Sequence, residues 1–157
     1  MWQYKHMVVV VFFAVVADQL TKYLVLENLT PSQTIVVIPA FFNLVLTFNP
    51  GAAFGMMADL QEPYRYFVLG AATFFAIVAV LYFFVKDYRS DFFAQIALSL
   101  IIGGAIGNII DRVRFGMVVD FLDFYIGDNH WPAFNLADSC ICLGVVILFL
   151  RKPVKTA

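Results

Sequence analysis

Long runs of apolar residues dominate the chain and predict helices that cross a membrane. A crossing requires about 20 mainly apolar residues. Four stretches meet this requirement: Met7–Leu26, Tyr66–Val85, Phe92–Ile110 and Trp131–Leu150. We therefore predict an all-α integral membrane protein with four transmembrane helices, formed as a single polytopic membrane domain over residues 1–157.

A shorter apolar stretch, Ile35–Phe48, is interrupted by Pro39 and is too short for a crossing. Its β-branched and aromatic residues favour strands instead. This stretch lies in the first of the two long connections between the predicted helices, residues 27–65 and 111–130. We therefore expect strands within the first connection.

The distribution of Lys and Arg predicts the orientation in the membrane, because short cytoplasmic connections carry the excess of these residues. With the N-terminus inside, the inner segments hold six of them and the outer segments hold three. The inner set is Lys5, Lys86, Arg89, Arg151, Lys152 and Lys155, and the outer set is Arg65, Arg112 and Arg114. We expect cytoplasmic N- and C-termini, with the connections 27–65 and 111–130 on the extracytoplasmic side.

Composition excludes several classes of function. Hydrophobic residues make up 62% of the chain and charged residues 13%, against roughly 45–50% and 25% in an ordinary soluble domain. At a net charge of −1, the chain matches neither a soluble enzyme, nor a disordered tail, nor a nucleic-acid binder with a basic face. Cys140 and Cys142 are too few and too close together for a disulfide framework, and we interpret them as ordinary apolar residues.

The polar residues within or beside the predicted crossings converge on one membrane face. An ionisable residue inside a crossing costs about 2.5–3.5 kcal/mol on insertion scales, so each one requires an explanation. In the predicted topology, separate segments place their unusual polar residues at the outer face. These are Asp18, Lys22, Asn49 to Gly55, Asn108, Asp111, Arg112, Asp120, Asn135 and Asp138. The convergence predicts a functional site.

Simpler explanations exist for some of these residues. Asp18 and Lys22 are spaced i, i+4 and share a helix face, so they equally well form a structural pair that braces the first helix. Arg112 and Arg114 also fit a role as anchors at the membrane interface.

Other candidate positions favour a structural interpretation more strongly. Gly103, Gly104 and Gly107 fit close helix packing better than ligand binding. Asp123 and Asp128 are expected to be solvated charges in a loop.

Asp120 and Asp138 are the candidates for chemistry, because two carboxylates near apolar surface repel one another unless one holds a proton. Helix capping is a weak explanation for Asp138, since Pro132 and Asn135 already mark the start of the fourth helix. Two carboxylates that share a proton activate a water and protonate a leaving group, as in aspartic proteases. Ser139 fits a nucleophile less well, because neighbouring residues on a helix diverge. HExxH and CxxC spacings for zinc are lacking, whereas magnesium on the carboxylates stays open.

Five sequence blocks stand out when these positions are taken together: Asp18–Lys22, Asn49–Gly55, Gly103–Arg112, Val119–Phe121 and Pro132–Asp138. In this order, and in a chain of this length and hydropathy, they resemble the conserved blocks of the bacterial lipoprotein signal peptidase (signal peptidase II) family. The resemblance spans about residues 10 to 150.

The resemblance implies an aspartic endopeptidase of the bacterial cytoplasmic (inner) membrane. Such enzymes remove the signal peptide from diacylglyceryl-modified prolipoproteins by cleaving before the lipidated cysteine, and they are inhibited by globomycin. The implied fold is four transmembrane helices with a small extracytoplasmic β-sheet, and the implied catalytic residues are Asp120 and Asp138. Other family site residues match Asp18, Lys22, Asn49, Asn108, Arg112 and Asn135.

The resemblance also implies that no metal or cofactor is used. The expected partners are lipid-modified prolipoproteins and membrane lipids, without nucleic acid, and we expect a monomer. A small proton- or ion-coupled transporter is the alternative function, because intramembrane Asp and Lys also mark ion pathways. A transporter predicts polar residues along the full depth of the bundle. A structural subunit of a membrane complex is a third possibility, but it leaves Asp120 and Asp138 unexplained.

Overall fold

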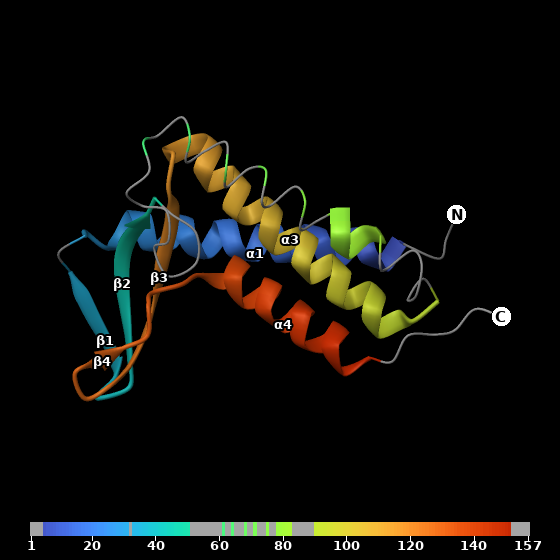
Figure 1. Cartoon of the computed structure of the whole chain (residues 1–157). Coiled ribbons are helices and arrows are strands. Elements are labelled where there is room, and N and C mark those ends of the chain that lie inside the picture. Colours follow the sequence, from blue (N-terminus) through green and yellow to red (C-terminus); the bar gives the residue numbers. More distant parts are fainter. Residues whose placement is uncertain are drawn as a thin grey trace.

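The protein consists of a helical bundle with a small sheet at one end. The computed structural model describes residues 5–31, 33–50, 61, 64, 68, 71, 75, 78–82 and 90–151. In these residues the elements are α1 (Lys5–Asn28), β1 (Thr34–Ile38), β2 (Phe42–Asn49), α3 (Phe92–Phe115), β3 (Val118–Ile126), β4 (Asn129–His130) and α4 (Leu136–Leu150). The three helices lie side by side, and the sheet covers the end that is remote from the start of α1 and the end of α4 (Figure 1).

Two of the described helices are long and apolar enough to cross a membrane. These are α1 and α3, with 24 residues each, and α4 is a shorter apolar helix. Large apolar side chains on α1 point outward: Val8, Phe12 and Phe13 are all at least 60% exposed. An exposed apolar face of this kind is suited to contact with lipid.

The helix ends differ from the predicted ends of the crossings. Helix α3 continues five residues past Ile110 to Phe115. It ends where Gly116 adopts a left-handed conformation (φ 71°) and its N–H donates to the Arg112 carbonyl, an arrangement that favours glycine. Helix α4 begins at Leu136, after the N-cap Asn135, so Pro132 precedes the helix and does not start it.

The predicted crossing Tyr66–Val85 lies largely outside the described residues. Its described positions, which are 68, 71, 75 and 78–82, are helical.

The sheet is antiparallel, with strand order β1-β2-β3-β4. Strands β1 and β2 confirm the strands expected in Ile35–Phe48. The connection 111–130 contributes β3 and β4, which the sequence analysis did not predict. The first four residues of β3 are all buried, so the strand has no alternation of apolar and polar residues by which to recognise it.

The end of α1 packs against the sheet through an apolar cluster. Val25 and Leu29 contact Leu46 of β2 and Val119 and Phe121 of β3, and all five side chains are at most 7% exposed. This cluster fixes β3, and with it Asp120, relative to α1.

Small residues bring the helices into close contact. A Cβ atom on Gly103 would lie 2.7 Å from the Cβ of Ala14 in α1, and one on Gly104 would overlap the Ala137 carbonyl oxygen of α4. These contacts support the interpretation of the glycines as packing positions. Gly104 therefore sets how closely α4 approaches α3 next to Asp138.

Gly104→Ala is expected to lower the melting temperature of the protein in detergent. The added methyl group meets backbone of α4, and overpacking of this kind costs about 1–3 kcal/mol. Thermal unfolding of the purified variant measures the effect. Val113→Ala, on the 82% exposed surface of the same helix, is the control, and equal melting temperatures for the two variants would refute close packing at Gly104.

Candidate active site

A buried lysine lies between two buried carboxylates at the sheet end of the helices. Lys22 Nζ is 2.9 Å from Asp18 Oδ2 and 2.8 Å from Asp111 Oδ2. The three side chains are 2%, 0% and 1% exposed, respectively. We call these residues the charge clamp. The i, i+4 pairing expected for Asp18 and Lys22 is confirmed, and Asp111 joins it from α3.

Asp18 of the clamp also holds the first turn of α4. Its Oδ1 accepts a hydrogen bond of 2.9 Å from the backbone N–H of Ala137. Ala137 directly precedes Asp138, so the clamp fixes the backbone that carries this aspartate.

Asp111 performs the same role for β3. Its Oδ2 accepts a hydrogen bond of 3.1 Å from the backbone N–H of Val119, which directly precedes Asp120. Each acidic member of the clamp thus binds the amide next to one candidate catalytic aspartate.

Gln19 reinforces the clamp and was not among the predicted site residues. Its Nε2 donates to Asp111 Oδ1 at 3.0 Å, to Asp18 Oδ2 at 3.1 Å and to the Gly107 carbonyl at 3.2 Å. Its position inside the Asp18–Lys22 block was the available signal in the sequence.

Two asparagines connect the clamp with both candidate aspartates. Asn108 Oδ1 accepts from Lys22 Nζ at 3.1 Å, and its Nδ2 donates to Asp138 Oδ1 at 2.8 Å. Asn135 Nδ2 donates to Asp120 Oδ1 at 2.7 Å and to Asn108 Oδ1 at 3.2 Å. A continuous series of hydrogen bonds therefore links Asp120 to Asp138.

Asp120 is almost completely buried, at 2% exposure, and Asn49 of β2 donates to its Oδ2 at 3.0 Å. Burial, and to a smaller extent repulsion by Asp138, raises the pKa of Asp120 to about 6, although hydrogen bonds from Asn49 and Asn135 act in the opposite direction. A carboxyl group with this pKa exchanges its proton near neutral pH.

Asp138 caps the start of α4 in addition to lining the site. The backbone N–H of Asn135 donates to Asp138 Oδ2 at 3.4 Å, and the Asp138 N–H donates to Asn135 Oδ1 at 2.9 Å. Capping, which the sequence analysis rated a weak explanation for Asp138, is therefore present, because this exchange is a capping box. Ser139 diverges as expected and donates its hydroxyl to the Asn135 carbonyl.

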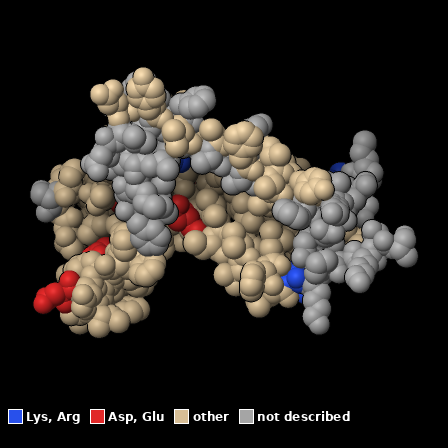
Figure 2. Space-filling model, in the orientation of Figure 1, with Lys and Arg blue, Asp and Glu red and all other residues tan. Residues whose placement is uncertain are grey.

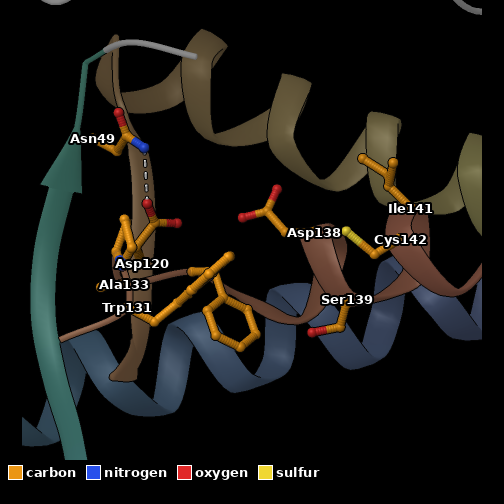
Figure 3. A pocket seen from close by; sticks show the side chains of 10 residues that line it. Asn49, Asp120, Trp131, Ala133, Asp138, Ser139, Ile141 and Cys142 are labelled. Atoms are coloured by element: carbon orange, nitrogen blue, oxygen red, sulfur yellow. Dashed lines mark hydrogen bonds between the residues drawn. The ribbon is translucent and has the colours of Figure 1, made fainter. Parts of the chain in front are cut away.

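A cavity of about 510 Å³ opens between the sheet and α4. The carboxyl groups of Asp120 and Asp138 face each other across it (Figure 3). Acidic side chains are visible in the hollow between the sheet and the helices (Figure 2). The remaining lining is mostly apolar and comprises Asn49, Trp131, Pro132, Ala133, Phe134, Ser139, Ile141 and Cys142. The geometry suits chemistry on a largely apolar ligand.

Arg112 lies near both candidate aspartates at the end of α3. Its guanidinium attracts Asp138 most strongly, followed by Asp120 and Asp111. Arg114 is exposed on the last turn of α3, with its guanidinium 4.8 Å from the centre of the Phe115 ring.

The expectation that Asp123 is a solvated loop charge is wrong. Asp123 is 7% exposed and lies in β3. Its Oδ2 accepts from Asn43 Nδ2 at 2.9 Å, and its Oδ1 is 2.8 Å from His130 Nδ1. Asp128 is exposed in the turn between β3 and β4, as expected.

The structure joins most of the predicted site residues into one network. Hydrogen bonds and ion pairs connect Asp18, Lys22, Asn49, Asn108, Asp120, Asn135 and Asp138. The 51–55 part of the predicted Asn49–Gly55 block lies outside the described residues. Within the described part of the chain, no three His, Cys, Asp or Glu side chains are grouped as metal ligands.

Comparisons with known proteins agree over nearly the whole chain. A family model described as signal peptidase (SPase) II matches residues 10–152. A lipoprotein signal peptidase of Syntrophotalea carbinolica is 45% identical over 151 residues, covering 96% of this chain and 92% of that protein. Another, from Syntrophus aciditrophicus, is 42% identical and covers 88% of this chain and 86% of its own length.

The fold is also similar to that of solved membrane enzymes. A bacterial membrane enzyme determined by the in meso method at 2.3 Å resolution has a TM-score of 0.78 and 35% identity, covering 96% of this chain and 94% of that chain. A second bacterial membrane enzyme, at 1.9 Å resolution, has a TM-score of 0.77 and 37% identity, covering 92% of this chain and 90% of that chain.

Lys22→Met is expected to destabilise the protein strongly. The substitution leaves Asp18 and Asp111 buried without their shared cation, and removing one partner of a buried ion pair costs about 3–5 kcal/mol. Thermal unfolding in detergent measures the loss. Glu27→Gln removes an exposed charge from the same helix and is the control. If Lys22→Met unfolds at the same temperature as Glu27→Gln, the clamp does not support the fold.

Proposed function

The chain belongs to the signal peptidase II family, and from this premise we propose that it cleaves signal peptides from diacylglyceryl-modified prolipoproteins before the lipidated cysteine. The observation that carries the proposal is the pair of carboxyl groups on Asp120 and Asp138. They face each other across a largely apolar cavity and are joined through amide hydrogen bonds. This arrangement supports an aspartic endopeptidase mechanism.

In the proposed mechanism, Asp120 and Asp138 share one proton. The ionised carboxylate accepts a proton from a water molecule as the water oxygen attacks the scissile carbonyl carbon. The protonated carboxyl group donates its proton to the leaving amide nitrogen, and the peptide bond breaks. The products are the signal peptide with a free carboxylate and the lipid-modified cysteine with a free amine. The pKa of about 6 for Asp120 supports this exchange, because the group holds or releases a proton near neutral pH.

The surrounding polar residues have supporting roles in this proposal. Asn49 and Asn135 donate to opposite oxygens of Asp120, and Asn108 donates to Asp138, so the three amides orient the pair. Beside them, Arg112 provides positive charge near both carboxylates.

The charge clamp of Lys22, Asp18 and Asp111 holds the elements on which the pair stands. We assign its residues to positioning rather than to chemistry, because their charges are paired with one another and their remaining hydrogen bonds go to backbone amides, to Gln19 and to Asn108.

The apolar walls of the cavity fit a substrate that keeps its acyl chains in the bilayer. Removing acyl chains from lipid is unfavourable by about 0.8 kcal/mol per CH₂, so the peptide must reach the aspartates from the side. Ile141 and Cys142 line the cavity on α4, and Cys142 is exposed. We propose that the substrate enters laterally along this face of α4.

The proposed topology has four transmembrane helices with the sheet outside the bacterial inner membrane and both termini in the cytoplasm. Lys5 and Arg151 lie at the helix ends remote from the sheet, in agreement with the excess of positive charge on the cytoplasmic side. The enzyme acts as a monomer in this proposal.

The transporter alternative predicts polar residues along the full depth of the bundle. In the described half of α3 remote from the sheet, Gln95 and Ser99 are buried polar residues, and the Ser99 hydroxyl donates to the Gln95 carbonyl. The ionisable residues of the network gather at the sheet end instead. This distribution favours a protease over an ion pathway.

Asp120→Asn and Asp138→Asn are each expected to abolish cleavage of a lipid-modified prolipoprotein. Asparagine keeps the size of the side chain but removes the shared proton, and acid–base catalysis contributes about 100- to 10,000-fold. Signal-peptide release by purified protein measures the loss. Asp128→Asn, in the exposed β3–β4 turn, should keep its activity. Near-normal turnover by Asp138→Asn would rule out the aspartic mechanism.

Asn49→Leu is expected to shift the pH dependence of cleavage. The Asn49 hydrogen bond lowers the pKa of Asp120, so its removal raises this pKa above about 6. The limb of the pH profile of kcat/KM that reflects the titration of Asp120 should therefore move to higher pH. Asn28→Leu, at the exposed end of α1, serves as the control. An unchanged limb, or one moved to lower pH, would contradict the assignment.

A further inference from the structure

Gln19 is a polar residue of α1 at the contact with α3, and the mechanism proposed above gives it no role. Its side chain is half-buried, whereas the next residue, Leu20, is 53% exposed on the surface of the bundle. A polar side chain within a crossing requires an explanation, and hydrogen bonds to a neighbouring helix are the usual one. The partners of Gln19 therefore indicate what it does.

The side-chain amide of Gln19 meets three acceptors with a single nitrogen. Its Nε2 lies 3.0 Å from Asp111 Oδ1, 3.1 Å from Asp18 Oδ2 and 3.2 Å from the Gly107 carbonyl oxygen. An amide nitrogen carries only two hydrogens, so two of these acceptors share one N–H. The nitrogen thus lies between the two acidic members of the charge clamp.

The clamp has more negative than positive charge, which gives a donor at this position a physical purpose. The one ammonium group of Lys22 forms ion pairs with both Asp18 and Asp111, and the guanidinium of Arg112 attracts Asp111. Buried carboxylates need hydrogen bonds in addition to such pairing. Gln19 donates one to each of the two.

Gln19 determines which oxygen of Asp111 faces β3. Gln19 holds Oδ1, and Oδ2 accepts from Lys22 Nζ and from the Val119 N–H. Rotation of this carboxylate would break the hydrogen bond from Gln19, which is strengthened by the charge of its acceptor. The contact from Asp111 to the amide that precedes Asp120 is therefore held in place by Gln19.

The same argument applies to Asp18 and α4. Gln19 and Lys22 both hold Asp18 Oδ2, so that Oδ1 faces the Ala137 N–H. Gly107 provides the space for this arrangement, since a Cβ atom there would overlap Asp18 Oδ2. Gln19 therefore also secures the contact to the amide that precedes Asp138.

We propose that Gln19 is a positioning residue for the reaction, because it locks the orientation of Asp18 and Asp111 and thereby keeps Asp120 and Asp138 opposite each other across the cavity. This inference rests on the proposed function. Gln19 is not among the residues that line the cavity, so it acts through the clamp. A displacement of about 1 Å at reacting groups costs up to about 100-fold in rate.

Gln19→Met tests this inference, since methionine keeps the length of the side chain but has no N–H donor. We expect kcat for a lipid-modified prolipoprotein to fall at least about tenfold, because the two aspartates are misaligned. KM should change less than about twofold, because the walls of the cavity are unchanged. Gln33→Met, the same change at an exposed residue before β1, is the matched control. Equal kcat values for the two variants, or a loss confined to KM, would overturn the inference.

Gln19→Glu separates positioning from a merely structural role. A protonated carboxyl group has one O–H donor to offer Asp111, whereas an ionised one has none. At low pH, kcat of this variant should exceed that of Gln19→Met at least about fivefold, and the ratio should decline as the pH rises. Both variants are assayed below their melting temperatures. A ratio of one at every pH would show that the donor does not matter and would refute the inference.

The titration of Asp120 reports on the alignment without turnover. Asp138 raises the pKa of Asp120, and this effect weakens if the two carboxyl groups move apart. Infrared spectra of protein with isotopically labelled aspartate should therefore give a lower midpoint for Asp120 in Gln19→Met than in Gln33→Met or the unaltered protein. An equal midpoint in all three would contradict positioning by Gln19. If unaltered protein cleaves no prolipoprotein, the proposed function fails, and this midpoint still decides whether Gln19 aligns the pair.

Discussion

The ion pairs of Lys22 with Asp18 and Asp111 are the interaction on which the rest of the site depends. The single ammonium group of Lys22, at 2% exposure, forms ion pairs with two carboxylates on different helices. Buried charges of this kind are tolerated only when they are paired and hydrogen-bonded. The two carboxylates also accept hydrogen bonds from Gln19 and from the backbone amides of Ala137 and Val119, so one clamp holds α1, α3, α4 and β3 together.

The clamp also explains why the two aspartates of the cavity are suited to share a proton. Lys22 forms its ion pairs with Asp18 and Asp111. Asp120 and Asp138 receive hydrogen bonds from the neutral amides of Asn49, Asn108 and Asn135, and the guanidinium of Arg112 lies nearby. Neutral donors compensate burial only in part, and the pKa of Asp120 consequently rises to about 6. The protein thus separates an ion-paired structural cluster from the adjacent pair of candidate catalytic carboxyl groups.

Much of this site was predictable from the sequence because helical spacing and polar residues within apolar runs are local signals. The i, i+4 spacing of Asp18 and Lys22 predicted their contact correctly. The partners of Asp123 were not predictable in the same way. Asn43 is 80 residues away in the chain, and only the register of β2 against β3 brings the two together.

Strand β3 was not predictable from the sequence for a related reason. A strand buried on both faces lacks the alternation by which a strand is recognised, so residues 118–126 resembled a connection. The capping role of Asp138 likewise depends on where α4 begins. The structure places this start at Leu136 rather than near Pro132, which puts Asp138 at the third helical position.

The coupling between Asp120 and Asp138 is the central claim, and the titration of Asp120 tests it most directly. Infrared spectra of protein with isotopically labelled aspartate report the protonated carboxyl group, and the band that disappears in Asp120→Asn identifies Asp120. We predict a midpoint near pH 6 in the unaltered protein, since the pKa of Asp120 is about 6. The midpoint should be lower in Asp138→Asn, because the charge of Asp138 raises this pKa. The same midpoint in both proteins would show that the two carboxyl groups do not interact and would contradict the account.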